Sequence, residues 1–89
     1  MPDHPFAALC YALDATTGRT WHPDDDGAHT TGWLWRVERI GRHLHLTTGT
    51  ALVAEVEQDT DPWVTAEAIA DAIAAHTARI TTTTEELTL

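Results

Sequence analysis

Two histidines, His43 and His45, lie two residues apart in a segment that alternates polar and apolar side chains. On a β-strand this spacing places both imidazoles on one face, where the predicted hairpins make Glu38 and Glu55 their cross-strand neighbours. His43, His45 and Glu55 form a ligand set that divalent metals accept, so a metal-binding sensor or enzyme is one hypothesis. Because cross-strand pairing of histidine with glutamate explains the same pattern, we expect pairing, with no metal and no cofactor bound.

A second group of possible metal ligands lies in the segment 22–29, which contains Asp24, Asp25 and Asp26 between two histidines. Hard cations favour carboxylate-rich loops, but the spacing of a calcium-binding EF-hand loop is missing. The proline and glycine of this segment are typical of an exposed loop, and we interpret Gly27 as its turn residue. We therefore expect a solvated acidic loop that separates two halves of a sheet.

Nucleophilic catalysis lacks its usual residues in this chain. Cys10 is the single cysteine, it has no basic neighbour in sequence that would lower its pKa, and the chain contains no serine. The sequence also lacks a glycine-rich phosphate loop with its lysine. We expect Cys10 to be a small buried hydrophobic residue and the protein not to be an enzyme.

The acidic character of the chain points to a different kind of function. The formal net charge is −9 over 89 residues. Such a charge repels nucleic-acid phosphates and anionic lipids, so we expect no direct nucleic-acid binding and no membrane binding. We predict an inhibitor or modulator that engages a basic surface of a partner protein and imitates phosphate charge if that partner handles nucleic acid. The predicted partner-binding acids are Asp24, Asp25, Asp26, Glu55, Glu57, Asp59 and Asp61.

Exposed apolar residues support an alternative function. Leu34 and Ile40 are predicted to point away from the core and to flank Arg36 and Glu38 as a contact patch. Such a patch would suit an adaptor or chaperone-like subunit, or a homodimer. For location, the single cysteine fits a reducing compartment, and neither a signal peptide nor a membrane span is recognised, so we expect the cytoplasm.

The elements that position these residues begin with an ambiguous segment. Residues 6–13 alternate as a strand would, and a loop at 16–18 would pair Leu13 with Trp21 in a hairpin. Apolar residues also recur at helical spacing, at Phe6, Leu9, Cys10 and Leu13. We prefer the strand, and the helix stays the alternative.

The centre of the predicted sheet has a clearer pattern. Strands at Trp33–Ile40 and His43–Thr47 are joined by the two-residue loop Gly41-Arg42, a register in which Ile40 faces His43. One face of this hairpin is then apolar, with Trp33, Trp35, Val37, Leu44 and Leu46.

A third predicted strand follows at Ala51–Glu57, after a three-residue loop. This register sets Leu52 beside Leu46 and places His43 opposite Glu55. It extends the apolar face of the hairpin by one more strand.

A long helix is predicted after the sheet. Asp61 supplies a carboxylate cap and Pro62 occupies the first turn, so the helix begins there and is expected to run to about Ile80. Its apolar stripe is formed by Trp63, Ala66, Ile69, Ala70, Ile73 and Ile80.

Together these elements predict an α+β fold. An antiparallel sheet of about five strands in hairpins is covered on one face by a C-terminal helix, within a single domain at residues 1–80. Residues 81–89, rich in threonine and glutamate, are predicted as an edge strand, a partner-binding strand or a disordered tail.

Three short elements, Tyr11–Leu13, Trp21-His22-Pro23 and Gly32-Trp33, are similar to parts of the small MbtH-like proteins, which assist adenylation domains of peptide synthetases. The likeness spans a small part of the chain. The middle loop is longer here, and the inserted hairpin and the threonine-rich tail do not belong to that pattern. We therefore assign the chain to no family.

Overall fold

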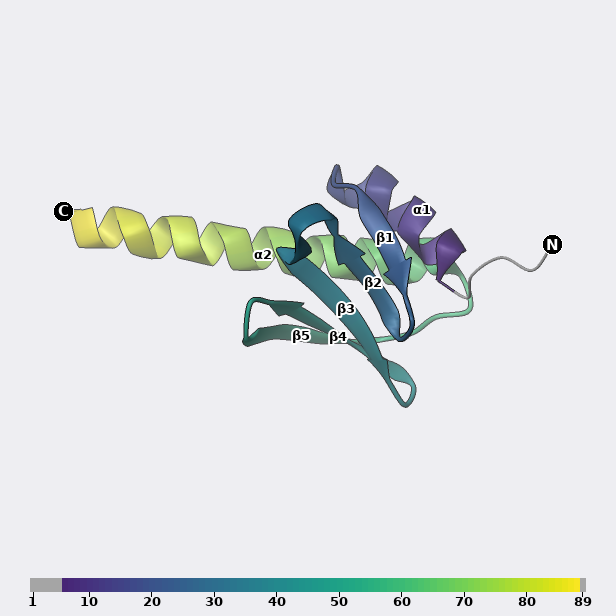
Figure 1. Cartoon of the computed structure of the whole chain (residues 1–89). Coiled ribbons are helices and arrows are strands. Elements are labelled where there is room, and N and C mark those ends of the chain that lie inside the picture. The colour runs from purple at the N-terminus through teal and green to yellow at the C-terminus, as the bar shows by residue number, and fades with distance from the viewer. Residues whose placement is uncertain (1–5, 89) are drawn as a thin grey trace.

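The chain folds into two layers, a five-stranded antiparallel sheet and a pair of helices on one of its faces (Figure 1). The computed structural model describes the backbone of residues 6–88 and the side chains of residues 6–79. The strands follow the simple order β1-β2-β3-β4-β5, so the predicted α+β fold class is confirmed. The elements are α1 (Ala7–Thr17), β1 (Trp21–Asp24), β2 (Gly27–Thr30), η1 (Thr31–Trp33), β3 (Trp35–Ile40), β4 (His43–Thr48), β5 (Ala51–Glu57) and α2 (Pro62–Thr88).

The first element is the helix α1, so the preferred strand at residues 6–13 and its pairing of Leu13 with Trp21 were wrong. The helical alternative holds because Phe6, Leu9, Cys10 and Leu13 are all buried against the same core. The helix ends at Gly18, whose φ of 70° allows its N–H to reach the Asp14 carbonyl at 3.1 Å.

Side chains at the end of α1 hold the start of the sheet. The Asp14 carboxylate accepts a hydrogen bond from the backbone N–H of Trp21 at 2.7 Å. The indole N–H of Trp21 donates to the Thr17 hydroxyl at 2.8 Å. Trp21 therefore packs beside the helix, not opposite Leu13 in a hairpin.

The segment 22–29, predicted as a loop, is instead the hairpin of β1 and β2. Its pairs run from Trp21 with Thr30 to Asp24 with Gly27, and β2 continues into the pairing with β3. Prolines and aspartates are depleted in strands, which is why the pattern predicted a loop. Pro23 fits because β1 is an edge strand.

Gly27 has a packing role, so the interpretation of this residue as a turn residue was also wrong. It is buried at the start of β2, and a Cβ at this position would overlap the carbonyl oxygen of Val37 and lie 2.9 Å from its carbonyl carbon. Glycine is needed here because the backbones of β2 and β3 approach each other closely.

The central hairpin has the predicted register. Ile40 faces His43 and Val37 faces Leu46, with Gly41 in the turn at a φ of 65°. The predicted start at Trp33 was two residues early, because the chain first forms the short 3-10 helix η1. Trp33 was also predicted on the apolar face, and it is exposed instead.

Strand β5 has the predicted bounds but a different register. The connecting turn is two residues long, and an irregularity between Leu46 and Thr47 shifts the pairing. Leu46 therefore pairs with Ala54, and Glu55 lies opposite His45 where His43 was predicted. Leu52, predicted beside Leu46, pairs with Thr47 and is exposed.

Helix α2 begins where predicted. The Asp61 carboxylate accepts the N–H of Trp63 at 2.9 Å, as an N-terminal cap does. The helix continues to Thr88, beyond the predicted end near Ile80, and so residues 81–88 are helical, not an edge strand. Extending an existing helix needs no new nucleus, which outweighs the β propensity of the threonines. Within residues 6–88, no helix has both the length and the apolar composition that a membrane crossing requires.

The core lies between the two helices and one face of the sheet. Of the predicted stripe on α2, Ala66, Ile69 and Ile73 are buried, whereas Trp63 is exposed and meets the ring of Tyr11 edge-on at 6.0 Å. The side chain of Ile80 lies outside the described residues. The sheet contributes Trp21, Ala28, Trp35, Val37, Leu44 and Leu46 to this core.

Candidate functional site on the open face of the sheet

One face of the sheet is turned away from both helices, and we call it the open face (Figure 1). Its members follow from the register, because directly paired residues lie on the same face of a sheet. One row across the open face runs through His22, His29, Arg36, Thr47 and Leu52. The neighbouring row runs through Asp24, Gly27, Glu38, His45 and Glu55.

The second row contains acidic residues from segments that are far apart in the sequence. Asp24 lies on the edge strand β1 and Glu55 on the opposite edge strand β5, with Glu38 between them on β3. We call Asp24, Glu38 and Glu55 the acidic row. Asp24 from one predicted partner-binding segment and Glu55 from the other therefore lie on the same face, at opposite edges of the sheet. Glu38, which lies between them, was not among the predicted site residues.

Arg36 is the one arginine that the register of the described strands places on the open face. Its guanidinium contacts Glu38 at 3.0 Å and approaches Asp24 at 3.7 Å. The Arg36 Nε atom is buried and has no hydrogen-bond partner among the described residues. The acidic row thus already holds one guanidinium of its own chain.

Asp24 is held in its ionised form. Burial by itself raises the pKa of this carboxyl, but hydrogen bonds from His29 and from the backbone N–H of Asp26, together with Arg36, bring the pKa below its ordinary value. His29 Nδ1 donates to the Asp24 carboxylate at 3.1 Å, because an ionised carboxylate can only accept. The negative charge of Asp24 is therefore a stable feature of the open face at neutral pH.

The histidines that suggested a metal site do meet Glu55. The Glu55 carboxylate lies 3.6 Å from His43 Nδ1 and 3.5 Å from His45 Nε2, each ring facing a different oxygen. Among the side chains that the structure describes, no group of histidine, cysteine and carboxylate residues is arranged to hold a metal ion. These contacts are those of cross-strand pairing.

The other predicted partner-binding acids divide into two groups. Asp25 and Asp26 are exposed in the turn between β1 and β2, beside Asp24, and Glu57 pairs with His43 on the open face. Asp59 and Asp61 instead organise the start of α2. The Asp59 carboxylate accepts the N–H of Asp61 at 2.8 Å, while the Asp59 N–H donates to Thr65 at 2.9 Å.

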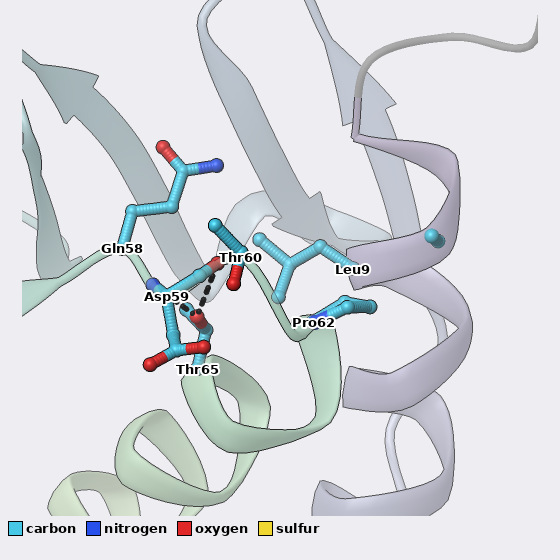
Figure 2. A pocket seen from close by; sticks show the side chains of 7 residues that line it. Leu9, Gln58, Asp59, Thr60, Pro62 and Thr65 are labelled. Carbon is cyan, nitrogen blue, oxygen red and sulfur yellow. Dashed lines mark hydrogen bonds between the residues drawn. The ribbon is translucent and has the colours of Figure 1, made fainter.

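A small recess lies beside this start of α2, between its first turn and α1. Figure 2 shows Asp59 hydrogen-bonded to Thr65 at its wall, with Leu9 and Pro62 facing it. Its volume is about 150 Å³. Sites for small-molecule ligands usually have volumes of about 300–1,000 Å³, so this recess suits water more than a substrate.

Trp33 is an aromatic residue that the sequence pattern placed on the apolar face and that lies elsewhere. Its indole stacks on the His29 ring with 3.6 Å between ring centroids and an angle of 4° between the planes. Because His29 belongs to the open face, Trp33 lies there too, and 57% of it is exposed. The one sequence signal for this placement is Gly32, whose φ of 81° turns the chain before Trp33.

Leu34 and Ile40, the predicted apolar patch, do not lie together. They are exposed, at 55% and 50%, but they flank opposite ends of β3. Ile40 adjoins His43 near one turn, whereas Leu34 follows Trp33 at the other end of the strand. The two residues are therefore separate exposed apolar positions and form no common patch.

Cys10 is buried in α1, as expected, and we predict that its thiol reacts slowly. Burial, with the nearby negative charges of Asp14 and Asp24, raises the pKa of Cys10 from 9.0 to about 11. Only the thiolate is nucleophilic, so at pH 8 iodoacetamide should alkylate the folded protein at least about 100-fold more slowly than the protein unfolded in guanidinium. Mass spectrometry measures both rates, and equal rates would show that Cys10 is not buried.

The protein was also compared with known families, sequences and structures. No family model, curated protein or solved structure matches the chain. The likeness to the MbtH-like proteins included Tyr11–Leu13 as a strand, and this segment belongs to the helix α1 instead.

Proposed function

We propose that this protein is a non-enzymatic binding protein whose open face engages a basic surface of a partner protein. The observation that supports this proposal is the acidic row, bordered by Asp25 and Asp26 in the β1–β2 turn. Arg36, the one arginine on the open-face side of the described strands, offsets part of this negative charge. The excess of carboxylates makes the open face complementary to lysine- and arginine-rich surfaces.

Among the described residues, neither helix packs on the open face, so a partner can reach it. Both helices bury the opposite face of the sheet, where the apolar core lies. The carboxylates of Glu38 and Glu55 stay accessible, with side-chain exposures of 42% and 52%. A partner can therefore contact them without disturbing the core, while the net charge of −9 steers a basic molecule toward the protein.

The effect on the partner follows from the kind of surface that is covered. A protein that occupies a basic surface blocks other anionic ligands from it, so we propose inhibition or modulation as the outcome. If the partner handles nucleic acid, the acidic row would compete with the phosphates of its ligand. Separation of Leu34 from Ile40 gives less support to the alternative of an adaptor with one apolar patch.

The test uses two variants that change the net charge equally. Glu38→Gln with Glu55→Gln neutralises the acidic row, whereas Glu67→Gln with Asp71→Asn neutralises exposed acids on α2. A basic partner is first captured from lysate with the wild-type protein, purified, and then titrated against each variant. We expect the acidic-row variant to bind at least about tenfold more weakly, and the α2 variant to lose less than about threefold.

Salt gives the second readout of the same experiment. Binding of the wild-type protein should weaken strongly between about 50 mM and 500 mM salt. Exposed charges further apart than the Debye length are screened, and this length shortens as the salt concentration rises. Equal losses for both variants would show that only net charge matters. A dissociation constant that does not change with salt concentration would rule out the charged interface that we propose.

A further inference from the structure

Trp33 offers one open aromatic face beside the acidic row. Its other face is covered by His29 at 3.6 Å, and more than half of the residue still meets solvent. An indole with one face stacked can keep this exposure only if the opposite face and the edges are accessible. His29 in turn is fixed by its hydrogen bond to Asp24, so the stacked pair of His29 and Trp33 has a defined position on the open face.

The backbone at Trp33 is strained in a way that folding does not explain. Its φ of 61° lies in the left-handed region, which residues other than glycine, and bulky ones above all, rarely adopt. Such a conformation is unfavourable for a residue with a side chain, because Cβ then comes close to the backbone. Because Trp33 contributes no burial to the core, the strain positions its ring on the open face and gains little for stability.

The chemistry around Trp33 selects one kind of cation. Tryptophan is the strongest aromatic partner for cations, and a planar guanidinium stacks on its face where an ammonium makes only a point contact. The acidic row already receives a guanidinium, because Arg36 contacts Glu38 at 3.0 Å and Asp24 at 3.7 Å. The acidic row therefore accepts a guanidinium as a cation, and the free face of Trp33 is the part of the surface that selects arginine over lysine.

The spacing between Trp33 and the acidic row also suits an extended peptide. The row of His29, on which Trp33 stacks, lies two residues along the strand from the acidic row. At about 3.4 Å per residue this separation is about 7 Å, which is also the distance between residues i and i+2 of an extended segment. Side chains at i and i+2 of such a segment point to the same side and can reach both rows.

We propose that the partner is recognised through an extended basic segment with an Arg-x-Arg pattern, in which one arginine stacks on the free face of Trp33 and the other meets the acidic row. This inference rests on the proposed function, since it assumes that the open face binds a basic surface. It adds the identity of the cation and assigns Trp33 as the residue that distinguishes arginine from lysine.

The test compares two peptides of equal length and charge, one with four arginines and one with four lysines, each alternating with glycine. Isothermal titration calorimetry at low salt gives the dissociation constant of each peptide. We expect the arginine peptide to bind at least about fivefold more tightly to the wild-type protein. Trp33→Leu keeps an apolar side chain without the aromatic face, and it should reduce this ratio to about one.

Three further variants make the result specific. Trp63→Leu removes another exposed tryptophan, on α2, and should leave the arginine preference unchanged. Glu38→Gln with Glu55→Gln should weaken both peptides by a similar factor. Circular dichroism confirms that each variant is folded before titration, and Trp33→Phe, which retains an aromatic face, should keep part of the preference.

The possible failures are distinguishable. If both peptides bind equally and the acidic-row variant weakens both, the role of Trp33 is overturned while the proposed function stands. If neither peptide binds the wild-type protein at low salt, the proposed function itself fails. A preference for arginine that survives Trp33→Leu would place the selectivity elsewhere on the open face and overturn this inference.

Discussion

Replacing Gly27 with alanine is expected to lower the free energy of unfolding by about 3 kcal/mol or more, from the addition of one methyl group. The methyl would overlap the Val37 carbonyl oxygen and lie 2.9 Å from the carbonyl carbon. Both atoms belong to the backbone of β3, which cannot rotate away as a side chain can. The clash therefore forces β2 away from β3, and with it the hairpin that carries Asp24 and His29.

Urea denaturation followed by circular dichroism measures this loss. Gly49→Ala is the matched control, because a Cβ at Gly49 meets no atom within 4 Å and the cost comes only from its φ of 59°. We expect about 1 kcal/mol for that control. Hydrogen exchange should show the loss of protection in β1 and β2 for Gly27→Ala. Similar losses for the two variants would mean that the strands tolerate the added methyl.

Phe6→Ala is expected to cost about 3–5 kcal/mol, as large aromatic truncations in cores do. Phe6 is 1% exposed at the start of α1 and belongs to the core shared by both helices and the sheet. The guanidinium of Arg39 also lies 5.4 Å from the centre of its ring, so the substitution removes a cation–π contact as well. For 89 residues a total stability of about 4–13 kcal/mol is ordinary, so this variant should lose a large fraction of its stability.

Phe6→Leu separates the two contributions in the same denaturation experiment. It keeps most of the buried apolar volume but loses the aromatic face, and we expect it to cost less than about 1.5 kcal/mol. Thermal unfolding should rank the proteins as wild type, Phe6→Leu and Phe6→Ala. If Phe6→Ala costs less than about 1 kcal/mol, α1 does not depend on this residue for its docking.

Phe6→Ala acts on the buried side of the sheet, whereas the proposed interface lies on the open face. Gly27 links the two, because it occupies the position between Asp24 and Glu38 in the register of the acidic row. Glycine there brings β2 close to β3 and leaves no side chain between the two carboxylates. We infer that this residue serves both the packing of the sheet and the accessibility of the open face.

Local sequence signals were sufficient for the centre of the fold. The alternation of Trp35 to Ile40 with His43 to Thr48, and the glycine of the turn, determined the register of β3 with β4. Asp61 before Pro62 determined the start of α2. In these places a short-range pattern and the final packing agree, and the pattern has one solution.

Only the tertiary structure decided the rest. Residues 6–13 fit both periodicities, and the helix prevailed because Phe6, Leu9 and Leu13 then pack against the same core. The shift after Leu46 moved Glu55 opposite His45, which no pattern within β5 indicates. The acidic row exists because the meander order spreads Asp24, Glu38 and Glu55 across one sheet. The amino-acid sequence by itself determined that acids were plentiful, but strand pairing between distant segments determined that these three share one row.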